Sequence, residues 1–102
     1  MANKYVFLYS GGDMPRSEAE GKAMMDAWMA WFGKAGPSIV DGGAPLASAS
    51  KIIGNGKTSG ASGYSIITAD SLDAAVNLTD NHPHLAHGGG IEVLECVKIP
   101  GM

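Results

Sequence analysis

The sequence has a single cysteine, Cys96, and no apolar run that approaches the length of a transmembrane helix. One cysteine excludes a disulfide within the chain and fits a reducing compartment. The first apolar stretch, Tyr5 to Tyr9, is also too short to be the core of a signal peptide. We therefore expect a cytoplasmic protein that does not associate with a membrane.

Charged residues are also scarce, and basic residues are the scarcer kind. Lys and Arg together number 7 against 10 Asp and Glu, which gives a formal net charge of −3. The basic residues are scattered, so the chain offers no positive patch to a phosphate backbone, and we expect no nucleic-acid partner. Hydrophobic residues make up 45% of the 102 residues, enough for one hydrophobic core. We predict a single domain over residues 1–102.

The first third of the chain predicts a strand followed by a long helix. Residues 4–10, KYVFLYS, are rich in aromatic and β-branched side chains and end at two glycines, which is typical of a strand. Ser17 followed by Glu20 is a capping box and predicts the start of the helix there. Gly36-Pro37 predicts its end, because glycine supplies a left-handed cap and proline cannot continue a helix.

The remainder predicts further strands and one more helix. The strand segments are 38–46, 48–53, 63–69 and 90–99. A loop rich in Gly, Ser and Asn joins the second and third of these segments, which predicts a hairpin. Asp70 is the expected cap of the second helix, and Pro83 ends that helix at or before His82.

The order β-α-β-β-β-α-β predicts an α+β protein with the split βαβ, or ferredoxin-like, arrangement, the middle hairpin being an elaboration. Such a fold has an antiparallel sheet with both helices on one face. The first strand is nevertheless apolar on both faces, with Tyr5, Phe7 and Tyr9 on one and Val6 and Leu8 on the other. Two helices cover only one face, so we predict that the opposite face forms a two-fold homodimer.

All three histidines, His82, His84 and His87, lie in the segment LTDNHPHLAH, residues 78–87. Histidine is the commonest metal ligand and also the usual acid–base group near neutral pH. Zinc sites need three or four ligands in recognised spacings, and those spacings are absent here, so we predict neither a metal nor a cofactor. The alternative is a solvated loop after the helix, in which the imidazoles cap carbonyls or face water.

Two other motifs are incomplete. Gly56-Lys57-Thr58 matches the end of a phosphate-binding loop, but Lys51 stands where the motif requires its first glycine, and the loop joins two strands. Cys96 lies within a predicted strand, away from any helix N-terminus that would activate a thiol, and there is no GxSxG motif. Nucleotide binding and nucleophilic catalysis are therefore not expected.

Asp41 is the best acid–base candidate among the carboxylates. It follows Ile39-Val40 at the end of a strand, where partial desolvation would suit it to proton transfer. The alternative is a turn aspartate bonded to the backbone across Gly42-Gly43. Trp28 and Trp31 likewise have two interpretations, as walls of a ligand pocket or as core and interface residues.

Several segments together resemble the YCII-related proteins, in the branch that includes the DGPF-type members: AWMAWFGKAG, VDGGAPL, GYSIITADSLDAAVNL, HPHL and IEVLE. The resemblance covers nearly the whole chain. It implies a ferredoxin-like fold that pairs as a dimeric α+β barrel. It also implies that Asp41 is the aspartate of the His–Asp pair proposed for some members. The first helix here has no histidine, so His82, before Pro83, would be the partner of Asp41.

Two functions are compatible with these observations. The first is a small-molecule-binding homodimer that transfers a proton on a small substrate, with Asp41 and His82 as catalytic residues and Trp28, Trp31 and His84 as ligand-binding residues. The second is a non-catalytic dimerisation or regulatory module without a substrate, in which the same side chains only pack. A pocket that touches Asp41 would favour the first function, and a filled interior the second.

Overall fold

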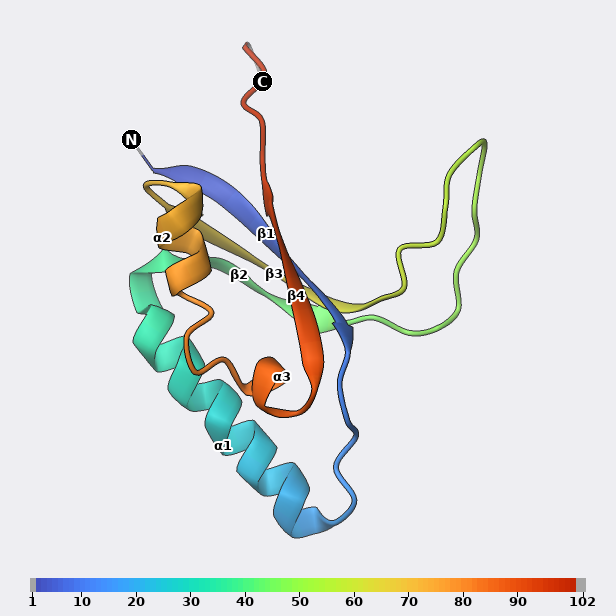
Figure 1. Cartoon of the computed structure of the whole chain (residues 1–102), viewed down its shortest axis with the longest axis vertical. Coiled ribbons are helices and arrows are strands. Elements are labelled where there is room, and N and C mark those ends of the chain that lie inside the picture. Colours follow the sequence, from blue (N-terminus) through green and yellow to red (C-terminus); the bar gives the residue numbers. More distant parts are fainter. Residues whose placement is uncertain (1, 101–102) are drawn as a thin grey trace.

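The computed structural model describes residues 2–100. Four strands form one antiparallel sheet in the order β2-β3-β1-β4 (Figure 1). The strands are β1 Asn3–Gly11, β2 Ile39–Pro45, β3 Ala61–Ala69 and β4 Gly89–Glu95, and the helical elements are α1 Glu18–Ala35, the 3-10 turn η1 Gly36–Ser38, α2 Leu72–Asn77 and α3 Pro83–Ala86. The predicted α+β class and antiparallel sheet are confirmed. The strand order is compatible with a ferredoxin-like fold.

The ends of α1 follow the local signals in the sequence. The Ser17 hydroxyl accepts a hydrogen bond from the backbone N–H of Glu20 at 3.1 Å, and the backbone of Gly36 adopts φ 39° where the helix ends. The predicted cap of the second helix is wrong by one residue, because Ser71 rather than Asp70 accepts the N–H of Ala74. The helix ends before His82, as predicted, since α2 ends at Asn77; a turn then leads to the single-turn helix α3, which was not predicted.

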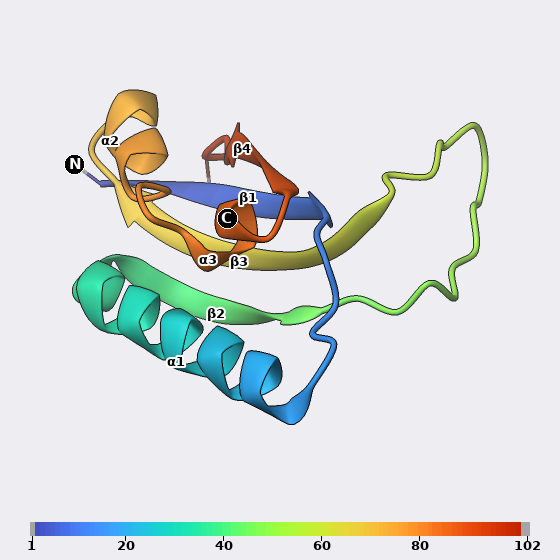
Figure 2. The same ribbon diagram turned by 60° about the horizontal axis from the view of Figure 1, so that its bottom comes forward.

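The predicted strand at 48–53 is wrong. Residues 46–60 form a long excursion that projects away from the rest of the molecule in both views (Figures 1 and 2). The pairing of β2 with β3 ends at Pro45 and Gly63, and only the N–H of Leu46 continues it, to the carbonyl of Ser62 at 2.9 Å. Beyond that point the segment has no neighbouring strand, so its backbone N–H and C=O groups are left to hydrogen-bond with solvent.

The last strand is also shorter than predicted. β4 ends at Glu95, and the N–H of Cys96 makes one more bond to the carbonyl of Lys4 at 2.9 Å. Because its partner β1 begins at Asn3, residues 97–99 extend past the available partner and lie exposed. A β pattern without a neighbour does not make a strand.

The two faces of the sheet differ as the alternation predicts. Tyr5, Phe7 and Tyr9 are buried against the helices together with Trp31 and Ile67. The other face carries Val6, Leu8, Ile66 and Leu94, which the strand register places side by side and which are all partly exposed. We call these four residues the open sheet face. No helix of the described chain covers it.

Candidate functional site

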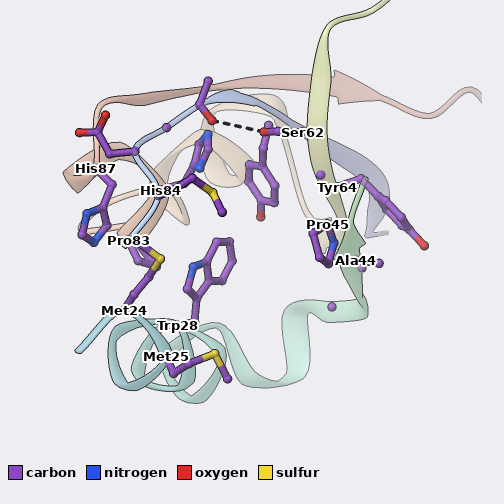
Figure 3. Close-up of a pocket in the computed structure, with 18 of the residues that line it drawn as sticks. Met24, Met25, Trp28, Ala44, Pro45, Ser62, Tyr64, Pro83, His84 and His87 are labelled. Carbon is purple, nitrogen blue, oxygen red and sulfur yellow. Dashed lines mark hydrogen bonds between the residues drawn. The ribbon is translucent and has the colours of Figure 1, made fainter. Parts of the chain in front are cut away.

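A half-open cavity of about 460 Å³ lies between α1, from Met24 to Phe32, the ends of β1, β2 and β3 and the short helix α3 (Figure 3). Its walls are largely apolar. The side chains that form them include Met14, Met24, Met25, Trp28, Met29, Phe32, Pro45 and Pro83. Figure 3 shows Trp28 projecting from α1 into this space, whereas the ring of Tyr64 points away from it. A cavity of this size falls in the range used for small-molecule ligands.

The structure divides the predicted site residues into two groups. Trp28 and His84 line the cavity. Trp31 does not, because it is 3% exposed in the core and its indole N–H donates to the carbonyl of Leu78 at 2.8 Å. His82 and Asp41 also lie outside the lining.

Of the two interpretations of Asp41, the structure shows the turn aspartate bonded to the backbone and not a buried carboxylate that faces a cavity. Its side chain is exposed, and its Oδ1 accepts a hydrogen bond from the backbone N–H of Gly43 at 2.8 Å. The register of β2 shifts on both sides of Asp41, and the residue is aligned with Ile66 on the open sheet face. The bulge therefore turns the carboxylate away from the helices, and Asp41 and His82 lie on opposite sides of the sheet.

His82 lies in the interior rather than in a solvated loop, with only 1% of its surface exposed. Its ring packs against Trp28 and Trp31, with centroid distances of 4.8 and 4.4 Å. The backbone N–H of His84 donates to Nδ1 at 3.1 Å, so His82 caps α3 with its side chain. The Nε2 atom lies 3.1 Å from the hydroxyl oxygen of Tyr9.

These contacts determine which atom carries the hydrogen at each step of a buried chain of hydrogen-bonded side chains. The Ser65 hydroxyl donates to the carbonyl of Gly42 at 2.9 Å, and the Tyr9 hydroxyl donates to Ser65 at 2.7 Å. The Tyr9 oxygen can therefore only accept from His82, whose Nε2 carries the hydrogen while Nδ1 remains an acceptor. His82 is thus a neutral imidazole with both nitrogens bonded.

The pKa values agree with this assignment. Burial lowers the pKa of His82 to about 4, and the nearby charge of His84 adds to the effect. Burial also raises the pKa of Tyr9 to about 12, against a smaller opposing contribution from the bond to Ser65. Near neutral pH neither group changes its charge, so this chain positions the surrounding elements rather than exchanging protons with a ligand.

Two histidines, His84 and His87, line the cavity, and the ring of His84 is held by a contact with the backbone. Its Nε2 lies 2.9 Å from the carbonyl oxygen of Ser10, which is an acceptor only, so Nε2 carries a hydrogen. In the neutral ring Nδ1 then keeps a free lone pair. The ring lies between Gly12 and Gly89, where an added Cβ would collide with it, and the ring of Tyr9 is 5.1 Å away between centroids. A histidine held by one nitrogen and free at the other is the usual arrangement of a general base.

The charged and titratable groups around the cavity are few. Asp13 and His87 line it beside His84, and the N–H of Asp13 donates to the carbonyl of His87 at 2.8 Å. None of the lining residues is Lys or Arg. Within residues 2–100, no group of three or more His, Cys, Asp or Glu side chains is placed to hold a metal ion.

Sequence reasoning did not find most of the cavity lining. Met25 and Met29 are 63% and 64% exposed on α1, and Met14 is 81% exposed. The sequence contained one signal for Met25 and Met29, since the apolar stripe of the helix is wider than a single packing face requires. The glycines beside His84 had no such signal, because their contacts come from segments distant in the sequence.

No family model matches this sequence, and no curated protein is significantly similar to it. Among the described residues, no helix combines the length and apolar character needed to cross a membrane.

Proposed function

We propose that this protein is a homodimer that binds a small molecule in the cavity and transfers a proton, with His84 as the base. The observation that carries the proposal is the Nε2 contact of His84 with the Ser10 carbonyl, which leaves Nδ1 as the acceptor nitrogen of a side chain that lines an apolar cavity. The expected base, Asp41, points to the other side of the sheet, so His84 takes its role.

The surroundings of His84 suit proton transfer. The Ser10 carbonyl selects the tautomer with a hydrogen on Nε2, and it also stabilises the imidazolium that forms when Nδ1 takes a proton. Gly12 and Gly89 hold the ring in one orientation. A ligand that fills the half-open cavity would displace water from its apolar walls, which strengthens the hydrogen bond between the base and the ligand.

The homodimer is the second part of the proposal. The open sheet face, Val6, Leu8, Ile66 and Leu94, is an apolar patch on the side without helices. Such patches are uncommon on monomers, and a two-fold axis would bury this one against itself. The resemblance to YCII-related proteins supports the same pairing as a dimeric α+β barrel. We expect an obligate interface of roughly 2,000 Å² or more.

Ligand binding can be tested by screening small carboxylates, amines, alcohols and cyclic ketones in ¹⁵N-resolved NMR spectra. The indole N–H of Trp28 should shift, because Trp28 lines the cavity, while that of Trp31 should not, because it is buried and bonded to Leu78. If no compound moves the Trp28 signal, the binding proposal is wrong. The open sheet face would then favour the alternative function, a non-catalytic dimerisation or regulatory module.

Proton transfer can be tested with a neutral cyclic ketone, 2-tetralone, in D₂O. The base removes a proton from the carbon beside the carbonyl and a deuteron is returned, so proton NMR follows the exchange. We expect His84→Gln to slow this exchange by roughly 100-fold or more. The matched control Asp41→Asn should leave it unchanged, because Asp41 is exposed on the other side of the sheet. If His84→Gln exchanges as fast as the wild type, His84 is not the base.

A further inference from the structure

The cavity differs from most metabolite sites in its charges. Its lining contains no Lys or Arg, and its one carboxylate, Asp13, is negative. Phosphates and carboxylates bind best where several cationic or N–H donors converge, and the titratable donors of this lining are only the imidazoles of His84 and His87. The lining therefore disfavours an anion.

The hydrogen-bonding group with an assigned tautomer at the cavity, His84, offers an acceptor. The neutral His84 ring offers the lone pair of Nδ1, because its Nε2 hydrogen is bonded to the Ser10 carbonyl. Tyr9 also lines the cavity, but its hydroxyl already donates to Ser65 and accepts from His82. A ligand that hydrogen-bonds to Nδ1 of His84 must therefore be the donor, as a hydroxyl group can be.

The apolar walls favour a ring. Methionine thioethers pack well on aromatic faces and adapt to irregular shapes, and Met14, Met25 and Met29 are exposed around the space that a ligand would fill. Trp28 and Phe32 add aromatic surface from α1. An ammonium group would find Asp13 as a counter-ion, but Asp13 is exposed, so water screens it, and the ammonium would lose its hydration among thioethers.

We infer that the cavity binds an uncharged aromatic alcohol whose hydroxyl donates a hydrogen bond to Nδ1 of His84. This inference rests on the proposed function, since it names the ligand class of the same site. When the proton moves, the O–H bond breaks, Nδ1 gains the proton, the ligand becomes an aryloxide and His84 an imidazolium. The imidazolium keeps its Nε2 hydrogen bond to Ser10. The step needs no further reactant.

The test uses naphthalene compounds that differ in one substituent: 2-naphthol, naphthalene, 2-naphthoate and 2-naphthylmethylammonium. Their affinities are measured near neutral pH from the Trp28 indole signal. We expect 2-naphthol to bind roughly tenfold more tightly than naphthalene, as one good hydrogen bond allows, and both charged compounds to bind more weakly than 2-naphthol. The absorption spectrum of bound 2-naphthol shows directly whether its proton has moved.

The variant His84→Ala provides the second arm. It should reduce the affinity for 2-naphthol roughly tenfold, to the level of naphthalene, while the affinity for naphthalene itself stays within about twofold and shows that the cavity is intact. If the variant does not fold, the ratio of the affinities of the wild type for 2-naphthol and naphthalene still tests the hydroxyl contact. Equal or tighter binding of the carboxylate or the ammonium compound would overturn the ligand class but leave the cavity as a binding site. If none of the compounds moves the Trp28 signal, the ligand class is overturned, and a negative result in the wider screen would overturn the proposed function separately.

Discussion

The hydroxyl oxygen of Tyr9 lies 3.1 Å from Nε2 of His82, and both side chains are buried between the sheet and the helices. This contact joins β1 to the residue that caps α3. His84 lies two residues later, in the single turn of α3, with its own backbone N–H bonded to His82. The buried pair therefore determines where the cavity histidine stands, although neither member carries the proposed chemistry.

Replacement of Tyr9 by Phe should destabilise the protein. The hydroxyl would be lost, and the Nε2 hydrogen of His82 would be left buried without an acceptor. We expect a loss of about 1–3 kcal/mol in the free energy of unfolding, measured by urea denaturation. Tyr64→Phe is the matched control, because its ring points away from the interior, and it should change stability by less than about 0.5 kcal/mol. Equal effects of the two substitutions would argue against the buried chain.

Stability should fall in mild acid because of His82. Its pKa is about 4 in the folded protein and 6.5 when unperturbed, so between these values the unfolded chain binds a proton that the folded protein does not. The contribution of His82 to the free energy of unfolding reaches about 3 kcal/mol. It is complete above pH 6.5 and is lost as the pH falls towards 4. His82→Gln should remove this part of the pH dependence, measured as the difference between urea unfolding curves at pH 7 and pH 4. A variant with the wild-type pH profile would show that His82 is not the titrating group.

Gly89→Ala should displace His84. The added methyl group would meet Nε2 and the neighbouring ring carbons of His84, and the ring would have to leave the Ser10 carbonyl. We expect the proton exchange of 2-tetralone to fall at least tenfold while stability drops by about 1 kcal/mol, the value of one hydrogen bond. Gly33→Ala is the control, because nothing lies within 4 Å of its added methyl group on α1. That change should stabilise the helix by roughly 0.5–1 kcal/mol and leave exchange unaltered.

The homodimer can be tested with two apolar surface residues of similar exposure. Leu94, 40% exposed, belongs to the open sheet face, whereas Val76, 47% exposed, lies on α2. In sedimentation equilibrium at low micromolar concentration we expect the wild type and Val76→Lys at twice the 10.5 kDa chain mass. Leu94→Lys should no longer sediment at the dimer mass, because the interface would bury an unpaired charge. A folded wild-type monomer would overturn the proposed dimer.

Shortening the excursion of residues 46–60 should leave the fold intact. In this segment the predicted strand does not form, and Ile52 and Ile53 are 54% and 89% exposed. A variant that joins Ala47 to Ser59 through a Gly-Asn link should keep the melting temperature within a few degrees of the wild type, since loop closure entropy changes slowly with length. A drop of more than about 10 °C would indicate that the excursion makes stabilising contacts, and circular dichroism would distinguish unfolding from local change.

The sequence by itself determined the elements whose signals are local. The alternation of Tyr5, Val6 and Phe7 assigned the faces of β1, and Ser17 and Gly36 set the ends of α1, because caps and periodicities depend on residues a few positions apart. Where the signal needed a distant partner, the prediction was wrong. Residues 48–53 have strand-like composition, but the structure provides no strand beside them.

Only the tertiary structure decided which polar residues meet at the cavity. His82 and His84 are two residues apart and chemically identical, yet one is sealed between Tyr9 and Trp31 and the other faces the cavity. Asp41 lies on the other side of the sheet because a bulge changes the register of β2, and one residue of shift moves a side chain to the opposite face. Burial, tautomer and orientation come from neighbours far along the chain, so they exist only once the sheet and helices have packed.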